Sequence, residues 1–92
     1  MLLNDLSVGQ VVMSKSGRDK GRLFFVLKIV DDEYVLISDG DLRKLEKPKL
    51  KKVKHLIKYK LISENVKSKI LGNEKIDNAF LRCELKRLNP MF

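Results

Sequence analysis

The chain has 92 residues, 43% apolar and 35% charged, a composition typical of one compact globular domain and unlike that of a disordered segment. Its single cysteine excludes an intramolecular disulfide, and its longest unbroken apolar run, 23–27, is far shorter than the ~20 residues of a membrane-spanning helix. The net charge is +8 and no signal-peptide pattern opens the sequence, so we expect a soluble, cytoplasmic protein that attracts anions.

The positive charge is concentrated in one segment. Between Arg43 and Lys60 there are nine Lys or Arg residues and one acid, whereas the rest of the chain has 11 basic and 11 acidic residues. A block of one sign creates a field that concentrates an anionic partner, and nucleic acid is the most common partner of this kind. A solvated loop that binds nothing is the alternative.

Two apolar runs near the start of the chain are predicted strands. The first, 8–14, is short and rich in β-branched residues, and the second, 23–30, is apolar at seven of eight positions on both of its faces. A strand of the second kind needs cover on two sides. Between the runs, Gly17 and Gly21 are expected to bend the backbone among four cationic residues, an arrangement that suits phosphate.

The following segments complete a predicted sheet. A third strand, 34–38, follows a polar turn and forms a hairpin with the second, and 39–41 is another turn signal. The basic stretch 42–52 contains a proline and is predicted to be an exposed loop. Over 53–62 the alternation predicts one face toward the core and one toward solvent. The core-facing set is Val53, His55, Ile57, Tyr59 and Leu61, and the outward set is Lys54, Leu56, Lys58, Lys60 and Ile62.

Two short helices are predicted after residue 62. Ser63 is the expected N-cap of the first, which ends near Leu71 with Gly72 as its C′ residue. Its inward residues are Val66 and Ile70.

Asp77 is the expected N-cap of the second helix, which stops at Asn89-Pro90. Cys83 is predicted to be buried as a small hydrophobic residue. The apolar stripe of this helix is expected to cover Phe24 and Val26, and it consists of Phe80, Leu81, Leu85 and Leu88.

The pattern Val8-Gly9-Gln10-Val11-Val12, then Gly17, Lys20-Gly21 and the apolar run 23–26, resembles the KOW motif. The segment 31–56 is similar to bacterial KOW-domain RNA-binding proteins related to archaeal and eukaryotic large-subunit ribosomal proteins. The resemblance implies a small SH3-like barrel that contacts RNA or protein. We therefore expect a mainly β fold, with a KOW-type barrel at 1–62 that includes the basic segment 43–60, and a helical tail at 63–92 packed on it.

The expected function is non-catalytic RNA binding at ribosomal RNA or the ribosome during translation, as the resemblance implies. Lysine acts mainly as a point charge, so backbone contact and recognition of RNA shape are expected rather than base readout. Gly17 and Gly21 are the structural turn residues. The candidate RNA-binding residues are Lys15, Ser16, Arg18, Lys20, Arg22, Arg43, Lys44, Lys47, Lys49, Lys51, Lys52, Lys54 and His55.

Other interpretations stay open from the sequence alone. The two glycines also fit ordinary turns, and His55, Tyr34 and Tyr59 fit packed residues as well as stacking platforms. We find no nucleophile with a base, no P-loop and no metal-ligand pattern, so neither an enzyme, a metal nor a cofactor is expected. The rival function is a protein-interaction module in translation or transcription whose lysines only steer the encounter. Adsorption to a membrane is less favoured, because the basic block lacks large aromatic anchors.

Overall fold

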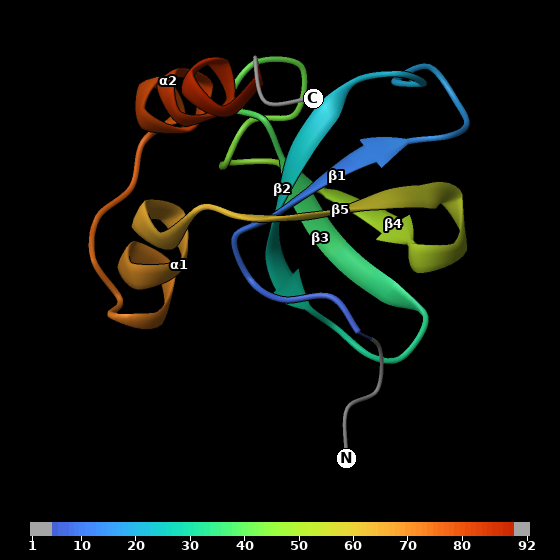
Figure 1. Cartoon of the computed structure of the whole chain (residues 1–92), viewed down its shortest axis with the longest axis horizontal. Coiled ribbons are helices and arrows are strands. Elements are labelled where there is room, and N and C mark those ends of the chain that lie inside the picture. Colours follow the sequence, from blue (N-terminus) through green and yellow to red (C-terminus); the bar gives the residue numbers. More distant parts are fainter. Residues whose placement is uncertain (1–4, 90–92) are drawn as a thin grey trace.

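The computed structural model describes residues 5–89 as a five-stranded antiparallel sheet followed by two helices (Figure 1). The mainly β architecture expected from the sequence is confirmed. The elements in chain order are β1 (Gln10–Ser14), β2 (Leu23–Ile29), β3 (Tyr34–Ser38), β4 (Lys49–Lys52), the 3₁₀ turn η1 (Val53–His55), β5 (Leu56–Ile62), α1 (Glu64–Leu71) and α2 (Asn78–Leu88).

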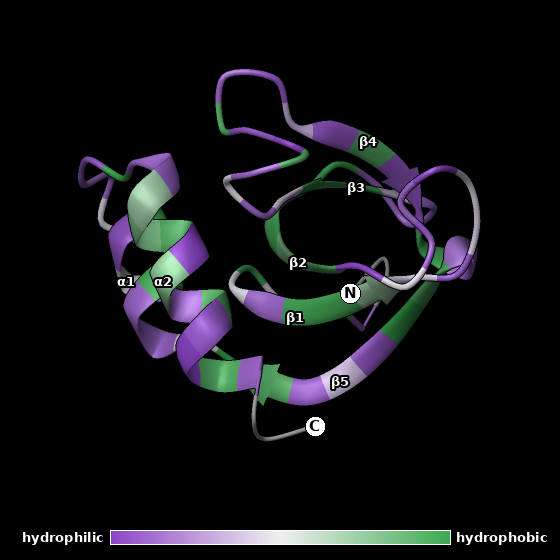
Figure 2. Cartoon of the chain, turned by 90° about the horizontal axis from the view of Figure 1, so that it is seen from above, coloured by the Kyte–Doolittle hydropathy of each residue, from purple (hydrophilic) through white to green (hydrophobic). Residues whose placement is uncertain are grey.

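The strand order is β4-β3-β2-β1-β5, so β4 and β5 are the two edges of the sheet. Within residues 5–89 these edges do not pair, and the sheet is therefore not closed into a barrel. It is nevertheless strongly curled. Val35 and Ile37 of β3 share a core with Leu56 of β5, although two strands lie between them, and Figure 2 shows this curl from above.

One hydrophobic core fills the inside of the curl. Val12 and Phe24 are opposite each other in the β1–β2 ladder, so their side chains point to the same face, and both are fully buried. Residues from β3 and β5 complete this inner core, because the curl brings the distant strands toward one another. Its members are Leu6, Val12, Phe24, Val26, Val35, Ile37 and Leu56.

The two helices cover the opposite face of the sheet. There Val11 and Phe25, the next pair of the β1–β2 ladder, pack with Val66 of α1 and with Leu81 and Leu88 of α2 in an outer core. The prediction that the second strand is covered on both sides is confirmed.

The predicted helix-covered face, however, is wrong, because Phe24 and Val26 point into the inner core. Alternation separates the two faces of a strand, but only the direction of the curl decides which face is enclosed and which receives the helices.

Helix α1 begins and packs as predicted. The Ser63 hydroxyl accepts a hydrogen bond from the Val66 N–H at 3.1 Å, and Ile70 packs half-buried against the outer core. The end of the helix differs by one residue. Gly72 has a φ of −83°, and Asn73 takes the left-handed conformation with a φ of +55°. An asparagine tolerates this conformation better than most residues, so it serves in place of the predicted glycine.

Helix α2 also has its predicted N-cap, since Asp77 Oδ1 accepts from the Phe80 N–H at 2.8 Å. The predicted stripe is confirmed, with Leu81 and Leu88 buried and the other two members half-buried. Cys83 is exposed, so its predicted burial is wrong. It lies between Leu81 and Leu85 in the sequence, but it lines the open groove beside the helix instead of the outer core. Pro90, the predicted stop, lies outside the described residues.

The basic segment contains a strand that sequence reasoning missed. The loop predicted over 42–52 ends at residue 48, because Lys49–Lys52 form β4 and pair with β3. The turn η1 then reverses the predicted alternation, so that Leu56 is buried and Ile57 is 41% exposed. Tyr59 and Leu61, predicted to face the same core as Val53, pack instead in the outer core, on the face opposite to Leu56. A local 3₁₀ turn of three residues is enough to exchange the two faces of the strand that follows.

The approach of α2 to the loop between β3 and β4 depends on Gly40. This residue has a φ of +76°, and a Cβ atom there would lie 2.3 Å from the Asn78 carbonyl oxygen. Asn78 Oδ1 accepts from the Leu45 N–H at 2.8 Å, and Arg82 donates to the Gly40 carbonyl at 2.7 Å. The first turns of α2 are therefore held directly against the start of the basic segment.

Candidate nucleic-acid interface

The loop between β1 and β2 is sharply bent. Gly17 and Gly21 have φ values of +83° and +85°, in the left-handed region where glycine is strongly favoured. The Gly21 N–H donates to the Ser14 carbonyl at 2.8 Å, which closes the loop on the end of β1. This geometry is what the predicted role of the two glycines as turn residues requires.

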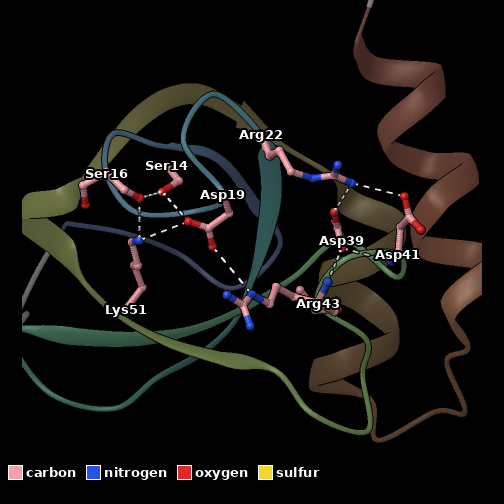
Figure 3. Close-up of polar contacts among 9 residues, drawn as sticks. Ser14, Ser16, Asp19, Arg22, Asp39, Asp41, Arg43 and Lys51 are labelled. Atoms are coloured by element: carbon pink, nitrogen blue, oxygen red, sulfur yellow. Dashed lines mark hydrogen bonds and ion pairs between the residues drawn. The ribbon is translucent and has the colours of Figure 1, made fainter.

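At the centre of this loop, Asp19 is a buried carboxylate shared by two cations (Figure 3). Asp19 Oδ1 accepts from Ser14 Oγ at 3.0 Å and lies 3.3 Å from Lys51 Nζ. Its second oxygen, Oδ2, lies 3.6 Å from Nε of Arg43. Lys51 also donates to the Ser16 carbonyl at 3.0 Å. These contacts join the bent loop to β4, the edge strand of the basic segment.

The contacts of Asp19 also determine its charge. Burial alone would raise the pKa of this carboxyl, but hydrogen bonds from Ser14 and Lys51 and the positive charge of Lys51 hold the pKa below its ordinary value. Asp19 is therefore ionised at neutral pH. Because two cations face one carboxylate, the group as a whole keeps a positive charge beside the loop.

Arg22, at the end of the same loop, belongs to a second ionic group. Its Nη2 lies 3.0 Å from Asp39 Oδ2 and 3.1 Å from Asp41 Oδ2. Asp39 Oδ1 in turn accepts from the backbone N–H groups of Asp41 and Arg43. The hydrogen bond to Asp39 raises the pKa of Arg22 above its ordinary value. This group fastens the start of β2 to the turn that follows β3.

The predicted site cations therefore fall into two sets. Arg22, Arg43 and Lys51 contact carboxylates, and Lys51 is buried, which leaves it little access to a ligand. The remaining predicted cations have exposed or half-buried side chains and no carboxylate within 4.0 Å in the described part of the chain. They are Lys15, Arg18, Lys20, Lys44, Lys47, Lys49, Lys52 and Lys54.

The two uncharged candidates contribute through their backbone. The Ser16 carbonyl accepts from Lys51 and from the Ser14 hydroxyl, and the His55 carbonyl accepts from the Lys15 N–H at 2.8 Å. Both side chains are half-buried. The contact of Lys15 with His55 sets the start of the loop beside η1.

The structure thus brings the loop and much of the basic segment together. Its start lies against η1, its centre against β4 and its end against the turn after β3. In Figures 1 and 2 the bend of the loop and η1 lie on the side of the sheet away from the helices. Lys58, farther along β5, is engaged elsewhere, because its ammonium group contacts the carboxylate of Asp5.

Sequence reasoning missed the role of Asp19. The available signal was its position, since it is the one acidic residue among four cations in 15–22. An acid in such a loop has several possible partners, and the sequence does not say that one of them comes from a strand about thirty residues later. The candidate interface is therefore organised by a carboxylate that was not among the predicted site residues.

A groove of about 630 Å³ lies between α2 and the β1–β2 hairpin. Met13 and Leu23 line it with apolar side chains, and Asp41, Arg82 and Lys86 line it with charged ones. Because its lining carries charges of both signs, the groove does not extend the cationic surface around the loop.

Of the residues that the structure describes, no three His, Cys, Asp or Glu side chains are placed to hold a metal ion together. Among the helices of that same part, none has the length and apolar character needed to cross a membrane. A scan of the chain against protein-family models and a search of curated proteins found no match.

Proposed function

We propose that this protein is a non-catalytic RNA-binding protein whose interface is the β1–β2 loop together with the unpaired cations of the basic segment. The observation that carries the proposal is the contact of Asp19 with Lys51 and Arg43. It holds the basic segment beside the glycine-bent loop, so that their free cations act on one ligand. A dense group of charges of one sign attracts phosphates and releases the counterions bound to them.

The likeness of the first hairpin to the KOW motif favours RNA over other polyanions. On this resemblance we propose an SH3-like relationship for the curled sheet and a partner in the translation machinery, ribosomal RNA or the ribosome. The position of the motif supports this, because the bent loop at its centre carries Lys15, Arg18 and Lys20 with exposed side chains.

Recognition at this interface is ionic and depends little on base sequence. Lysine ammonium groups contact phosphates as point charges, whereas reading base edges favours the planar fork of arginine. If about five phosphates of a single strand are neutralised, the logarithm of the affinity falls with the logarithm of salt concentration at a slope near −3.5.

The test compares two triple variants with the same change in net charge. In the first, Lys15, Arg18 and Lys20 of the loop are replaced by Gln. In the second, the exposed residues Lys28, Lys75 and Lys86, which lie outside the proposed interface, are replaced by Gln. Binding to a labelled RNA is measured by fluorescence anisotropy over a range of salt concentrations.

We expect the loop variant to lose about two units of salt slope and the control variant to keep the slope of the original protein. Equal effects of the two variants would show that only total charge matters, and the proposed interface would be wrong. Salt-independent binding would also contradict it. A protein complex that survives the loop changes while RNA binding is absent would favour the protein-interaction module.

A further inference from the structure

Among the residues that the structure describes, the cationic surface around the β1–β2 loop offers no exposed aromatic ring. Of the aromatic residues in 5–89, Phe24 and Phe25 are fully buried. Tyr34, Tyr59 and Phe80 are half-buried. Proteins that hold single-stranded RNA commonly stack its bases on exposed rings of this type.

The two tyrosines, of which Tyr59 lies within the basic segment, already have contacts of their own. Lys52 Nζ lies over the Tyr34 ring, 5.7 Å from its centroid, so the lysine covers a face on which a base would stack. The Tyr59 ring packs in the outer core, and its hydroxyl donates to Met13 Sδ at 3.7 Å. Neither ring is free to receive an unstacked base.

Arginine guanidinium groups, the other common stacking surface, are also mostly engaged. Arg22 and Arg43 face carboxylates, Arg82 donates to the Gly40 carbonyl, and Arg87 pairs with Glu84. Within the described residues only Arg18 has no such partner. Apart from Arg18, the contacts left to the interface are ammonium groups, which bind phosphates as point charges and do not stack on bases.

We infer that the RNA bound by this interface is base-paired and is held through the phosphates of its double helix. The inference rests on the proposed function of the same site. A double helix carries its phosphates at high linear density and in fixed positions, and each phosphate contact releases more counterions than in a single strand, about 0.9 against 0.7.

The rigidity of the interface points the same way. Asp19, Ser14 and Lys51 hold the centre of the loop, and the Lys15–His55 contact holds its start. A loop whose backbone is fixed in this manner presents its cationic side chains from fixed positions, which fits a ligand whose phosphates are also fixed. A flexible single strand would have to be ordered on binding, without stacking to offset the loss of entropy.

The experiment uses the full chain and three labelled ligands of equal length: a fully paired RNA hairpin, an RNA that cannot pair, and a DNA hairpin of the same sequence. At 0.1 M salt we expect the RNA hairpin to bind about tenfold more tightly than the unpaired RNA. With five phosphate contacts, the salt slopes for the paired and the unpaired RNA differ by about one. Starting from equal affinities at 1 M salt, this difference makes the two affinities differ about tenfold at 0.1 M salt.

The outcomes separate this inference from the function on which it rests. Unpaired RNA bound as tightly as the hairpin, with the loop variant still weakening both, overturns the inference and leaves the proposed function standing. Binding of neither RNA overturns the proposed function. Equal affinity for the DNA and RNA hairpins supports recognition of a phosphate double helix but overturns the assignment to RNA.

His55 supplies a second measurement, because its ring is half-buried and its backbone carbonyl contacts the start of the loop. We expect His55→Gln to change the affinity for both RNAs by less than twofold. A loss of affinity for the unpaired RNA alone would show that this ring stacks on a base, and the inference would fail.

Discussion

Lys51 Nζ lies 3.3 Å from Asp19 Oδ1, and this contact joins an edge strand of the sheet to a loop that precedes it by about thirty residues. The Lys51 residue is 8% exposed and Asp19 is 1% exposed. A buried pair of this kind adds little net stability by itself, but removing one partner leaves an uncompensated charge in the interior. The pair therefore determines where the loop lies.

Replacing Asp19 by Asn should destabilise the protein by about 3 kcal/mol, because Lys51 and Arg43 lose their shared carboxylate. Lys51→Met should cost less, since Arg43 and Ser14 still face Asp19. Chemical denaturation measures both values. Asp32→Asn, at an exposed turn position, is the control with no expected effect. An Asp19→Asn variant as stable as the original protein would contradict the role of this carboxylate.

Acid should destabilise the protein through carboxylates whose pKa is lowered on folding. Asp19 is one, and Glu84 is another, because Arg87, Ser63 and Asn65 donate to it. A carboxyl whose pKa is lower in the folded than in the unfolded state stabilises the fold at pH values above its unfolded pKa, about 3.9 to 4.3. This stabilisation is lost as the pH falls through the folded-state pKa. We expect unfolding free energy to fall below about pH 4, and less steeply in Asp19→Asn. Identical pH profiles would exclude this linkage.

Two glycines with similar backbone angles should respond differently to alanine. Gly21 has a φ of +85° and open space around it, so Gly21→Ala should cost only the left-handed penalty of about 1–2 kcal/mol. Gly40→Ala adds a clash with the backbone of Asn78, for which we expect a further ~1–3 kcal/mol. Thermal unfolding compares the two. Equal losses would mean that α2 does not approach Gly40 closely.

Arg18 and Arg22, four residues apart, should separate binding from stability. Arg18→Gln should reduce the salt slope of RNA binding by about 0.7–0.9 and change stability by less than about 0.5 kcal/mol. Arg22→Gln should leave the slope unchanged and lower stability by up to ~1 kcal/mol, since its ion pairs are partly exposed to water. The reverse pattern would place Arg22 in the interface.

The thiol of Cys83 should react with a water-soluble disulfide reagent in the native protein, because this residue is exposed on α2. We expect one equivalent of thiol to react in the native protein. The reaction rates with and without denaturant should agree within about a factor of ten, because an exposed thiol is reached without unfolding. Reaction only after denaturation would show that the residue is buried, as its apolar neighbours in the sequence predict.

The features predicted correctly from the sequence are those that depend on residues close together in the chain. Ser63 and Asp77 cap their helices by accepting from an N–H three residues later, a contact available wherever such a helix begins. Gly17 and Gly21 bend the loop because they lack a Cβ atom. The strands β1, β2 and β3 follow from short apolar runs between turn residues. The identity of these elements, and the charge of the segment after them, were therefore determined by the sequence itself.

Only the tertiary structure decided how these elements combine. The curl of the sheet directs Phe24 inward and Phe25 toward the helices. The alternating sequence pattern places the two residues on opposite faces but does not say which face is enclosed. Pairing of β4 with β3 buries Lys51 and leaves its neighbours accessible, which composition cannot distinguish. The physical reason is that burial and ion pairing depend on groups distant in sequence, and their positions are known only once the sheet has curled and the loop of Asp19 has met the edge strand.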